Sequence, residues 1–158
     1  MVKQKKKYIG EILIDKGLIT YEQLQEVIAE QMKNKQFLGE MLVKKGIISE
    51  DNLLEALAEQ FALNFVRLKD EAIDWEVAKG FSSSLITDHK CLPLRMDEDT
   101  VTIAITNPLN AWVLAMAEKE AAPRKVEIVL AKVSDIEKAI EAFRQYSVRT
   151  MMNKWRKK

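Results

Sequence analysis

The sequence predicts an α+β (mixed α/β) fold in which a four-helix tandem-hairpin repeat precedes a small β-α-β-β-α-β-α layer domain. Two observations lead to this prediction: a 24-residue segment occurs twice in the first half of the chain, and short strand-like segments begin only after Phe61. The 158 residues are 47% hydrophobic and 31% charged, which is typical of a folded protein. We expect a helical subdomain over 1–61, an α/β subdomain over 62–146 and a basic tail or linker over 147–158.

The repeat appears when the sequence is shifted against itself by 29 positions, which aligns residues 8–31 with residues 37–60. Eleven of the 24 aligned positions are identical, and four of the five glycines of the chain lie in the two copies. Neither helical hairpin alone can bury its apolar stripe. We therefore expect the two copies to pack face to face around a pseudo-two-fold axis.

Each copy carries the start and stop signals of two helices. Gly17 follows a short apolar helix and is the natural left-handed stop for it. Thr20 then offers an N-cap, with Gln23 three residues on to complete a capping box, and opens a longer helix that continues until Gln31. Ser49 repeats the cap in the second copy. Four helices are predicted.

Gly10 and Gly39 require a separate explanation, because glycine in a helix costs up to about 1 kcal/mol relative to alanine. One interpretation is a neighbouring helix that approaches the backbone closely. The other is an anion, because the amides at a helix start present donors and partial positive charge to a phosphate. The repeat alone leaves both open.

The pattern of the second half predicts elements in the order β-α-β-β-α-β-α. They are strand 65–68, helix 75–86, strands 89–96 and 100–106, helix 109–121, strand 126–132 and helix 134–145. Asn107 as N-cap and Pro108 at the first position are predicted to start the helix that continues through 109–121. Ser134 caps the last helix, with Glu137 completing a capping box.

The formal net charge of +1 conceals an uneven distribution. Lysines gather at 3–7, and residues 144–158 hold six basic and no acidic side chains, interleaved with Met151, Met152 and Trp155. One interpretation is that this tail lies on an anionic surface, either lipid headgroups or nucleic acid. The other is a solvated end or a linker to a further domain.

Composition and motifs argue against secretion, membrane spanning and catalysis. No apolar run approaches the roughly 20 residues that cross a bilayer, and residues 1–7 do not resemble a secretion signal. One cysteine and one histidine leave no internal disulfide and little for a zinc site, which fits a cytoplasmic setting. The G-x-x-x-x-G-K-[S/T] phosphate loop is absent, and His89 beside Cys91 suits a strand edge next to a small core thiol better than a nucleophile pair. We expect a protein that is not an enzyme.

The repeated pattern aromatic-[Leu/Ile]-Gly-Glu-x-Leu-[Ile/Val]-x-Lys-Gly resembles the tandem 24-residue motifs of the MshEN domain. That is the N-terminal domain of type II secretion and type IV pilus assembly ATPases, also called the GspE N-terminal domain family. Residues 89–94 and 101–109 are similar to the paired strands of the family and the helix that follows them. The resemblance covers residues 8–146.

The resemblance implies a non-catalytic binding module that receives the second messenger cyclic di-GMP in some members and needs no other cofactor. It implies docking on a secretion or pilus ATPase or on an inner-membrane platform protein, and hence a location in the cytoplasm or at the periphery of the inner membrane. It does not imply DNA binding, and membrane contact would be indirect or through the basic tail. The contacts implied by motif position are Tyr8, Ile9, Gly10, Leu13, Ile14, Gly17, Leu24, Ile28 and Gln31 in the first copy. Those in the second copy are Phe37, Leu38, Gly39, Leu42, Val43, Gly46, Leu53, Leu57 and Gln60.

The chain departs from the family at the opening position of each motif, where Tyr8 and Phe37 stand in place of the usual arginine. An aromatic ring still stacks on a base, but it supplies neither the charge nor the donor fork of a guanidinium. The sequence therefore leaves a second hypothesis open, in which the domain is a ligand-free protein–protein adaptor of the same fold.

Overall fold

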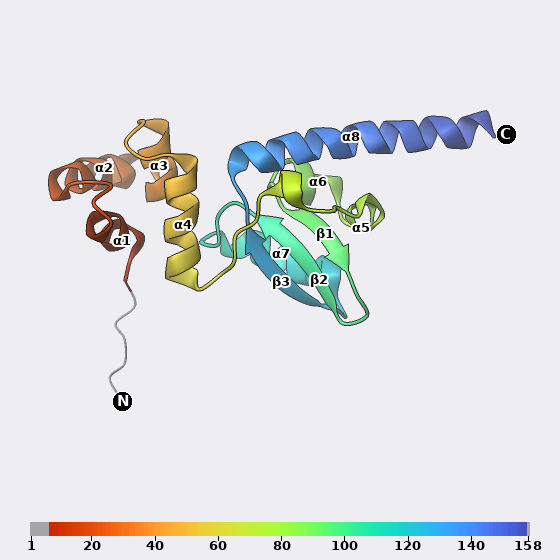
Figure 1. Cartoon of the computed structure of the whole chain (residues 1–158), viewed down its shortest axis with the longest axis horizontal. Helices are drawn as coiled ribbons and strands as arrows, with labels where there is room; N and C mark the ends of the chain where they lie inside the picture. Colours follow the sequence, from red (N-terminus) through yellow and green to blue (C-terminus); the bar gives the residue numbers. More distant parts are fainter. Residues whose placement is uncertain (1–6, 158) are drawn as a thin grey trace. The chain divides into compact units, whose positions relative to one another are not determined.

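The computed structural model describes residues 7–157 and has an α+β fold, with a three-stranded mixed sheet. The chain divides into two compact units, Met1–Leu63 and Asn64–Lys158, which we call the helical unit and the α/β unit (Figure 1). None of the helices within residues 7–157 is long and apolar enough to cross a bilayer.

In the helical unit, each helix of one hairpin packs against a helix of the other hairpin. The helices of this unit are α1 (Ile9–Asp15), α2 (Tyr21–Asn34), α3 (Leu38–Lys44) and α4 (Glu50–Phe61). Helix α1 packs against α4, and α2 packs against α3. The first helix of each copy thus contacts the second helix of the other copy, which confirms the pseudo-two-fold packing predicted from the repeat.

The helix ends in this unit follow the predicted signals. Gly17 and Gly46 have φ of 71° and 73°, the left-handed conformation that ends α1 and α3. The Thr20 hydroxyl accepts from the Gln23 amide at 3.1 Å while the Gln23 side chain accepts from the Thr20 amide at 2.9 Å, so the capping box is complete. The Ser49 hydroxyl caps α4. Helix α2 runs to residue 34, beyond the predicted end.

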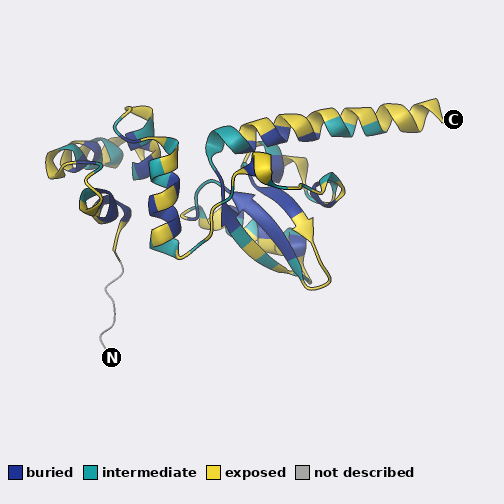
Figure 2. Ribbon diagram, in the orientation of Figure 1, coloured by how far each residue is buried: buried dark blue, intermediate teal, exposed yellow. Residues whose placement is uncertain are grey.

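The α/β unit is built on strands β1 (Leu92–Met96), β2 (Thr100–Ile105) and β3 (Lys125–Leu130), in the order β1-β2-β3. Strand β2 pairs antiparallel with β1 and parallel with β3. Helix α7 (Ala111–Ala121) connects the two parallel strands, and η1 (Leu68–Asp70), α5 (Trp75–Lys79), α6 (Ser83–Thr87) and α8 (Val133–Arg156) complete the unit. Ala104 of β2 belongs to a core with Leu68, Ile136 and Phe143, which places η1 and α8 over one face of the sheet; the burial is shown in Figure 2.

Two predicted elements of this unit are wrong. Segment 65–68 forms a single bridge from Phe65 to Leu130, because the chain then turns into η1 and buries Leu68 in the core. The predicted helix 75–86 is two short helices, since the first ends at Gly80 and the Ser82 hydroxyl caps a new start by accepting from the Leu85 amide at 3.4 Å.

The last two helices begin at other residues than predicted. Helix α7 starts after Asn110, whose side chain accepts from the Val113 amide, because the Asn107 side chain accepts from the Leu109 amide and holds the preceding residues in a turn. Helix α8 starts at residue 133 with Lys132 at its N-cap position, instead of at Ser134.

Helix α8 also continues far past its predicted end at residue 145. Its final turns, to residue 156, occupy most of the segment 147–158 that was predicted as a basic tail or linker. The extension has a simple cause: no glycine or proline occurs between 146 and 156, so nothing in the sequence stops the helix.

Candidate functional site

The two copies of the repeat are joined by a pair of symmetry-related ion pairs. The Lys16 amine lies 3.0 Å from the Glu59 carboxylate, and the Lys45 amine lies 2.7 Å from the Glu30 carboxylate. Both the lysines and the glutamates are separated by the same 29-residue shift that relates the copies. The side chains of each pair are about half exposed, and such a pair adds at most about 1 kcal/mol of stability. The pairs show that equivalent residues of the copies occupy equivalent places.

Gly10 and Gly39 are buried, and each lies under a leucine of the following helix. A Cβ on Gly10 would stand 2.9 Å from Cδ1 of Leu24, and one on Gly39 would stand 2.3 Å from Cδ1 of Leu53. Each glycine thus leaves room for a leucine side chain of the following helix to pack directly on its backbone. This contact supports the helix-packing interpretation of the glycines. The paired leucines are themselves identical across the repeat, a signal that was available in the sequence.

The other residues implied by motif position divide into three groups by exposure. One group is buried in the helical unit and shapes it from inside, namely Ile9, Leu13, Leu24, Leu42 and Leu57. A second group is partly exposed, namely Ile14, Ile28, Gln31, Phe37, Leu38, Val43, Leu53 and Gln60. The third group is exposed, namely Tyr8, Gly17 and Gly46. The second group and Tyr8 are the side chains that a ligand can reach without repacking of the core.

The two motif-opening residues occupy equivalent positions. Tyr8 and Phe37 are the N-cap residues of α1 and α3, both with extended backbone, and the Tyr8 side chain is 74% exposed. Next to Tyr8, the Lys7 amine donates to the Asp15 carboxylate at 2.6 Å, and this hydrogen bond raises the pKa of Lys7. Lys7, the described cation that precedes Tyr8 in the sequence, is therefore already paired.

Gln60 carries an unsatisfied polar atom at the end of the second copy. Its side-chain oxygen is buried and has no hydrogen-bond partner among the described residues. A buried acceptor left unpaired costs about 1–3 kcal/mol. A ligand that places an N–H group there would recover part of that free energy.

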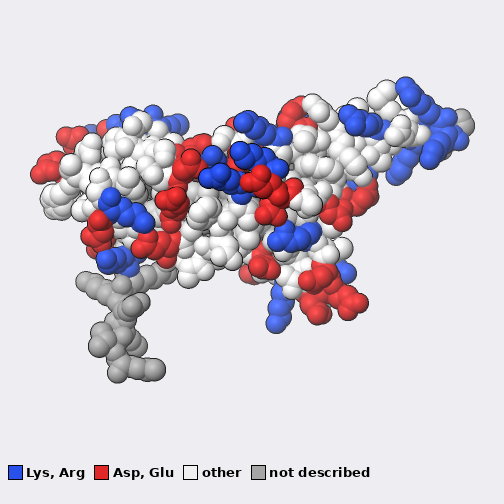
Figure 3. Space-filling view, in the orientation of Figure 1, with Lys and Arg blue, Asp and Glu red and all other residues white. Residues whose placement is uncertain are grey.

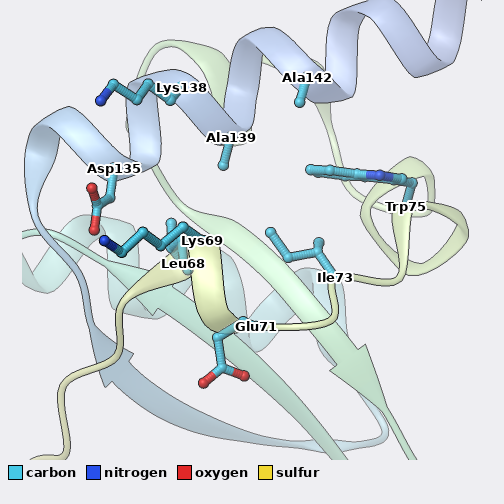
Figure 4. Close-up of a pocket in the computed structure, with 9 residues that line it drawn as sticks. All are labelled: Leu68, Lys69, Glu71, Ile73, Trp75, Asp135, Lys138, Ala139 and Ala142. Atoms are coloured by element: carbon cyan, nitrogen blue, oxygen red, sulfur yellow. The ribbon is translucent and has the colours of Figure 1, made fainter.

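The α/β unit has a hollow of its own, about 370 Å³ in volume, between η1 and α8. Its charged lining residues are Lys69, Lys138, Glu71 and Asp135, with Trp75 toward the opposite end from the two lysines (Figure 4). Two positive and two negative charges offset each other, so this hollow has no preference for an anion. None of the residues implied by motif position lines it.

Cys91 and His89 lack the chemistry of a nucleophile pair. Burial, with a smaller contribution from Glu120, raises the pKa of the Cys91 thiol to about 12. The thiol is fully buried and protonated at neutral pH, which confirms the prediction of a core residue. The His89 ring instead contacts Trp112, with 4.5 Å between ring centroids. Within residues 7–157, no group of three or more His, Cys, Asp or Glu side chains is arranged to hold a metal ion.

A family model for the MshEN domain matches residues 61–150, more than half of the chain. The chain belongs to the MshEN domain family. The match lies almost entirely in the α/β half, whereas the repeated motifs that resemble the family lie in the helical half.

Three solved structures share this fold. A structure of MshE with cdg matches with a TM-score of 0.78 and 22% identity, over 87% of this chain and 99% of that one. The N-terminal domain of XpsE matches with a TM-score of 0.68 and 16% identity, over 89% of this chain and 97% of that one. A second crystal form of the XpsE domain gives a TM-score of 0.57 at 18% identity, over 88% and 98% of the two chains. Among curated proteins no match to this chain was found.

Proposed function

We propose that this MshEN domain is a non-catalytic regulatory module of a secretion or pilus-type system and that its helical unit binds cyclic di-GMP across the two repeats. The observation that carries the proposal is the two-fold relation of the copies, seen in the Lys16–Glu59 and Lys45–Glu30 ion pairs. Cyclic di-GMP is itself a two-fold dianion with two guanines, so equivalent residues of the copies meet equivalent halves of the ligand. The shared fold with a structure of MshE with cdg supports the same ligand.

The proposed contacts come from the reachable side chains of the motifs. Tyr8 and Phe37 stack on the two guanines, each stack contributing about 1–3 kcal/mol. Gln31 and Gln60 make the polar contacts. The unpaired oxygen of Gln60 is buried, so it accepts from a guanine N–H once the side chain has turned toward the ligand. Leucines fill the space beside Gly10 and Gly39, so the proposed contacts do not use that space for the phosphates.

The missing arginines set the strength of this binding. A charged hydrogen bond contributes about 1.5–3 kcal/mol, so the loss of two weakens the complex by roughly two to four orders of magnitude. Lys16 and Lys45 are the C-cap residues of α1 and α3, and both already pair with glutamates. We therefore expect a site much weaker than one that opens both motifs with arginine.

The second candidate function is a ligand-free adaptor that docks on a secretion or pilus ATPase or on an inner-membrane platform protein. Two observations favour it: the leucines that cover Gly10 and Gly39, and the aromatic residues in place of arginine. In this function the repeats serve only to build a rigid docking surface.

Titration calorimetry of the whole chain with cyclic di-GMP separates the two functions. Binding predicts a saturable heat at tens of micromolar protein, strengthened in Tyr8→Arg/Phe37→Arg. Tyr21→Arg is the matched control, because Tyr21 is an exposed tyrosine outside the motif contact positions, and it should leave the affinity unchanged. If neither the natural chain nor the double arginine variant gives a binding heat, the adaptor function is the only one of the two that remains.

A further inference from the structure

The final turns of α8 carry an apolar stripe that the described part of the α/β unit leaves uncovered. Val148, Met151, Met152 and Trp155 are 57%, 57%, 51% and 74% exposed. Met151, Met152 and Trp155 follow Val148 by three, four and seven residues, which places all four on one face of the helix. Large apolar side chains gathered in this way on a surface mark an interaction site.

This stripe differs in direction from the one that anchors α8 to its own unit. The anchoring residues are Ile136, Ala139, Ile140 and Phe143, which are buried in the core. At about 100° per residue, the stripe at 148–155 lies roughly a third of a turn away around the helix axis. It faces away from the direction in which the helix meets the sheet, and Figure 1 shows these turns extending past α5.

Basic side chains border the stripe on both sides. Arg149 and Arg156, seven residues apart, lie on one flank, and Lys154 lies on the other. None of the three lies within 4 Å of a described carboxylate, although Lys154 contributes to the lowered pKa of Glu76 in α5. Arg144, by contrast, lies 3.6 Å from Glu141. Figure 3 shows the blue side chains gathered at this end of the α/β unit. No acidic residue follows position 141, so every charged side chain of the segment 144–157 is basic.

The apolar stripe and its basic flanks together indicate which kind of partner covers this face of α8. A second copy of the same helix would bring like charges together, which opposes self-association. Nucleic acid would satisfy the cations but would leave the valine, methionines and tryptophan without an apolar partner. An anionic lipid surface satisfies both, because acyl chains receive the stripe while headgroups pair with the flanking cations.

We propose that the segment 144–157 of α8 lies in the plane of an anionic membrane surface, with Val148, Met151, Met152 and Trp155 inserted and Arg149, Lys154 and Arg156 at the headgroups. The α/β unit is carried with it. Trp75 of α5 packs against Phe143 and Tyr146, with ring centroids 5.9 Å and 6.4 Å apart, so α8 is joined to the core just before the stripe begins. This attachment does not depend on cyclic di-GMP.

Vesicle co-sedimentation of the whole chain tests the proposal. We expect the protein to sediment with vesicles of equal parts phosphatidylglycerol and phosphatidylcholine, to stay in solution with phosphatidylcholine alone, and to be released by salt. Arg149→Gln/Arg156→Gln should weaken partitioning about 25-fold, since each basic residue near an anionic surface contributes about fivefold. Met151→Gln/Met152→Gln should weaken it at least about tenfold.

The controls use exposed residues outside the stripe. Met32→Gln/Met96→Gln removes two exposed methionines and Lys33→Gln/Lys44→Gln removes two exposed cations, and neither should alter partitioning. The far-UV circular dichroism of every variant should match that of the natural chain, since all the substitutions are on exposed side chains.

Three results would overturn the proposal. The first is an absence of sedimentation with anionic vesicles. The second is sedimentation that survives the methionine substitutions, which would indicate charge attraction without insertion. The third is a protein that does not bind the vesicles but binds a duplex DNA oligonucleotide, with the arginine substitutions abolishing DNA binding. That result would assign the face to nucleic acid.

Discussion

Leu53 lies on Gly39 so closely that the Cδ1 atom of the leucine is 2.3 Å from the place where a Cβ would stand. The equivalent distance from Leu24 to Gly10 in the first copy is 2.9 Å. The same contact therefore holds both hairpins together, and it is tighter in the second.

The first prediction concerns this difference. Gly39→Ala should destabilise the helical unit by about 1–2 kcal/mol, because overpacking costs about 1–3 kcal/mol while alanine recovers up to about 1 kcal/mol of helix propensity. Gly10→Ala should cost less, since its leucine has less far to move. Urea unfolding followed by far-UV circular dichroism measures both. A Gly39→Ala protein more stable than the natural chain would show that the leucine moves aside freely.

The second prediction concerns the two glycines that end α1 and α3. Gly17→Ala and Gly46→Ala should each destabilise the chain by about 1 kcal/mol, because φ of 71° and 73° strains any residue with a Cβ. No atom lies within 4 Å of the added methyl group, so the effect is conformational and free of any clash. Asparagine tolerates this conformation and should cost less at both positions in the same unfolding measurement. Equal losses for alanine and asparagine would contradict this account.

The third prediction concerns the buried thiol of Cys91, whose pKa burial raises from 9.0 to about 12. Below pH 9 the thiol is protonated in both folded and unfolded chains, so it adds no pH dependence. Between about pH 9 and 12 only the unfolded chain ionises, which lowers the stability of the fold as pH rises. Cys91→Ala should lose stability overall but should show a shallower decline of the urea midpoint from pH 8 to 11. Iodoacetamide should label the natural chain slowly at pH 8 and rapidly in urea.

The fourth prediction concerns the contact between α5 and α8. The Tyr146 hydroxyl donates to Glu76, and this hydrogen bond, followed by the one from Lys79, lowers the pKa of Glu76. Tyr146→Phe should raise that pKa toward its ordinary value, which NMR titration of the Glu76 carboxyl carbon measures. Because the carboxylate is exposed, the change in overall stability should be small. The lowered pKa would make the intact contact more stable above the titration range of Glu76 and weaker as pH falls through it.

Local signals in the sequence determined much of the helical unit. Gly17, Thr20 and Ser49 act within a few residues of themselves, so their effects on helix ends follow from the chain alone. The repeat added the pseudo-two-fold relation, because two identical stripes must cover one another. The same motifs, together with residues 89–94 and 101–109, indicated the resemblance to the MshEN family.

Tertiary structure decided what depends on residues distant in the chain. Whether Gly10 faces a ligand or Leu24, and whether Phe65 joins a strand or makes one bridge, are set by contacts that no local pattern encodes. The apolar spacing of the α8 stripe at 148–155 is present in the sequence. Its exposure follows from the fold, because α8 extends past the end of the sheet (Figure 1). Propensity and capping act over a turn, whereas burial is a property of the assembled core, and only the assembled core shows which apolar side chains remain for a partner.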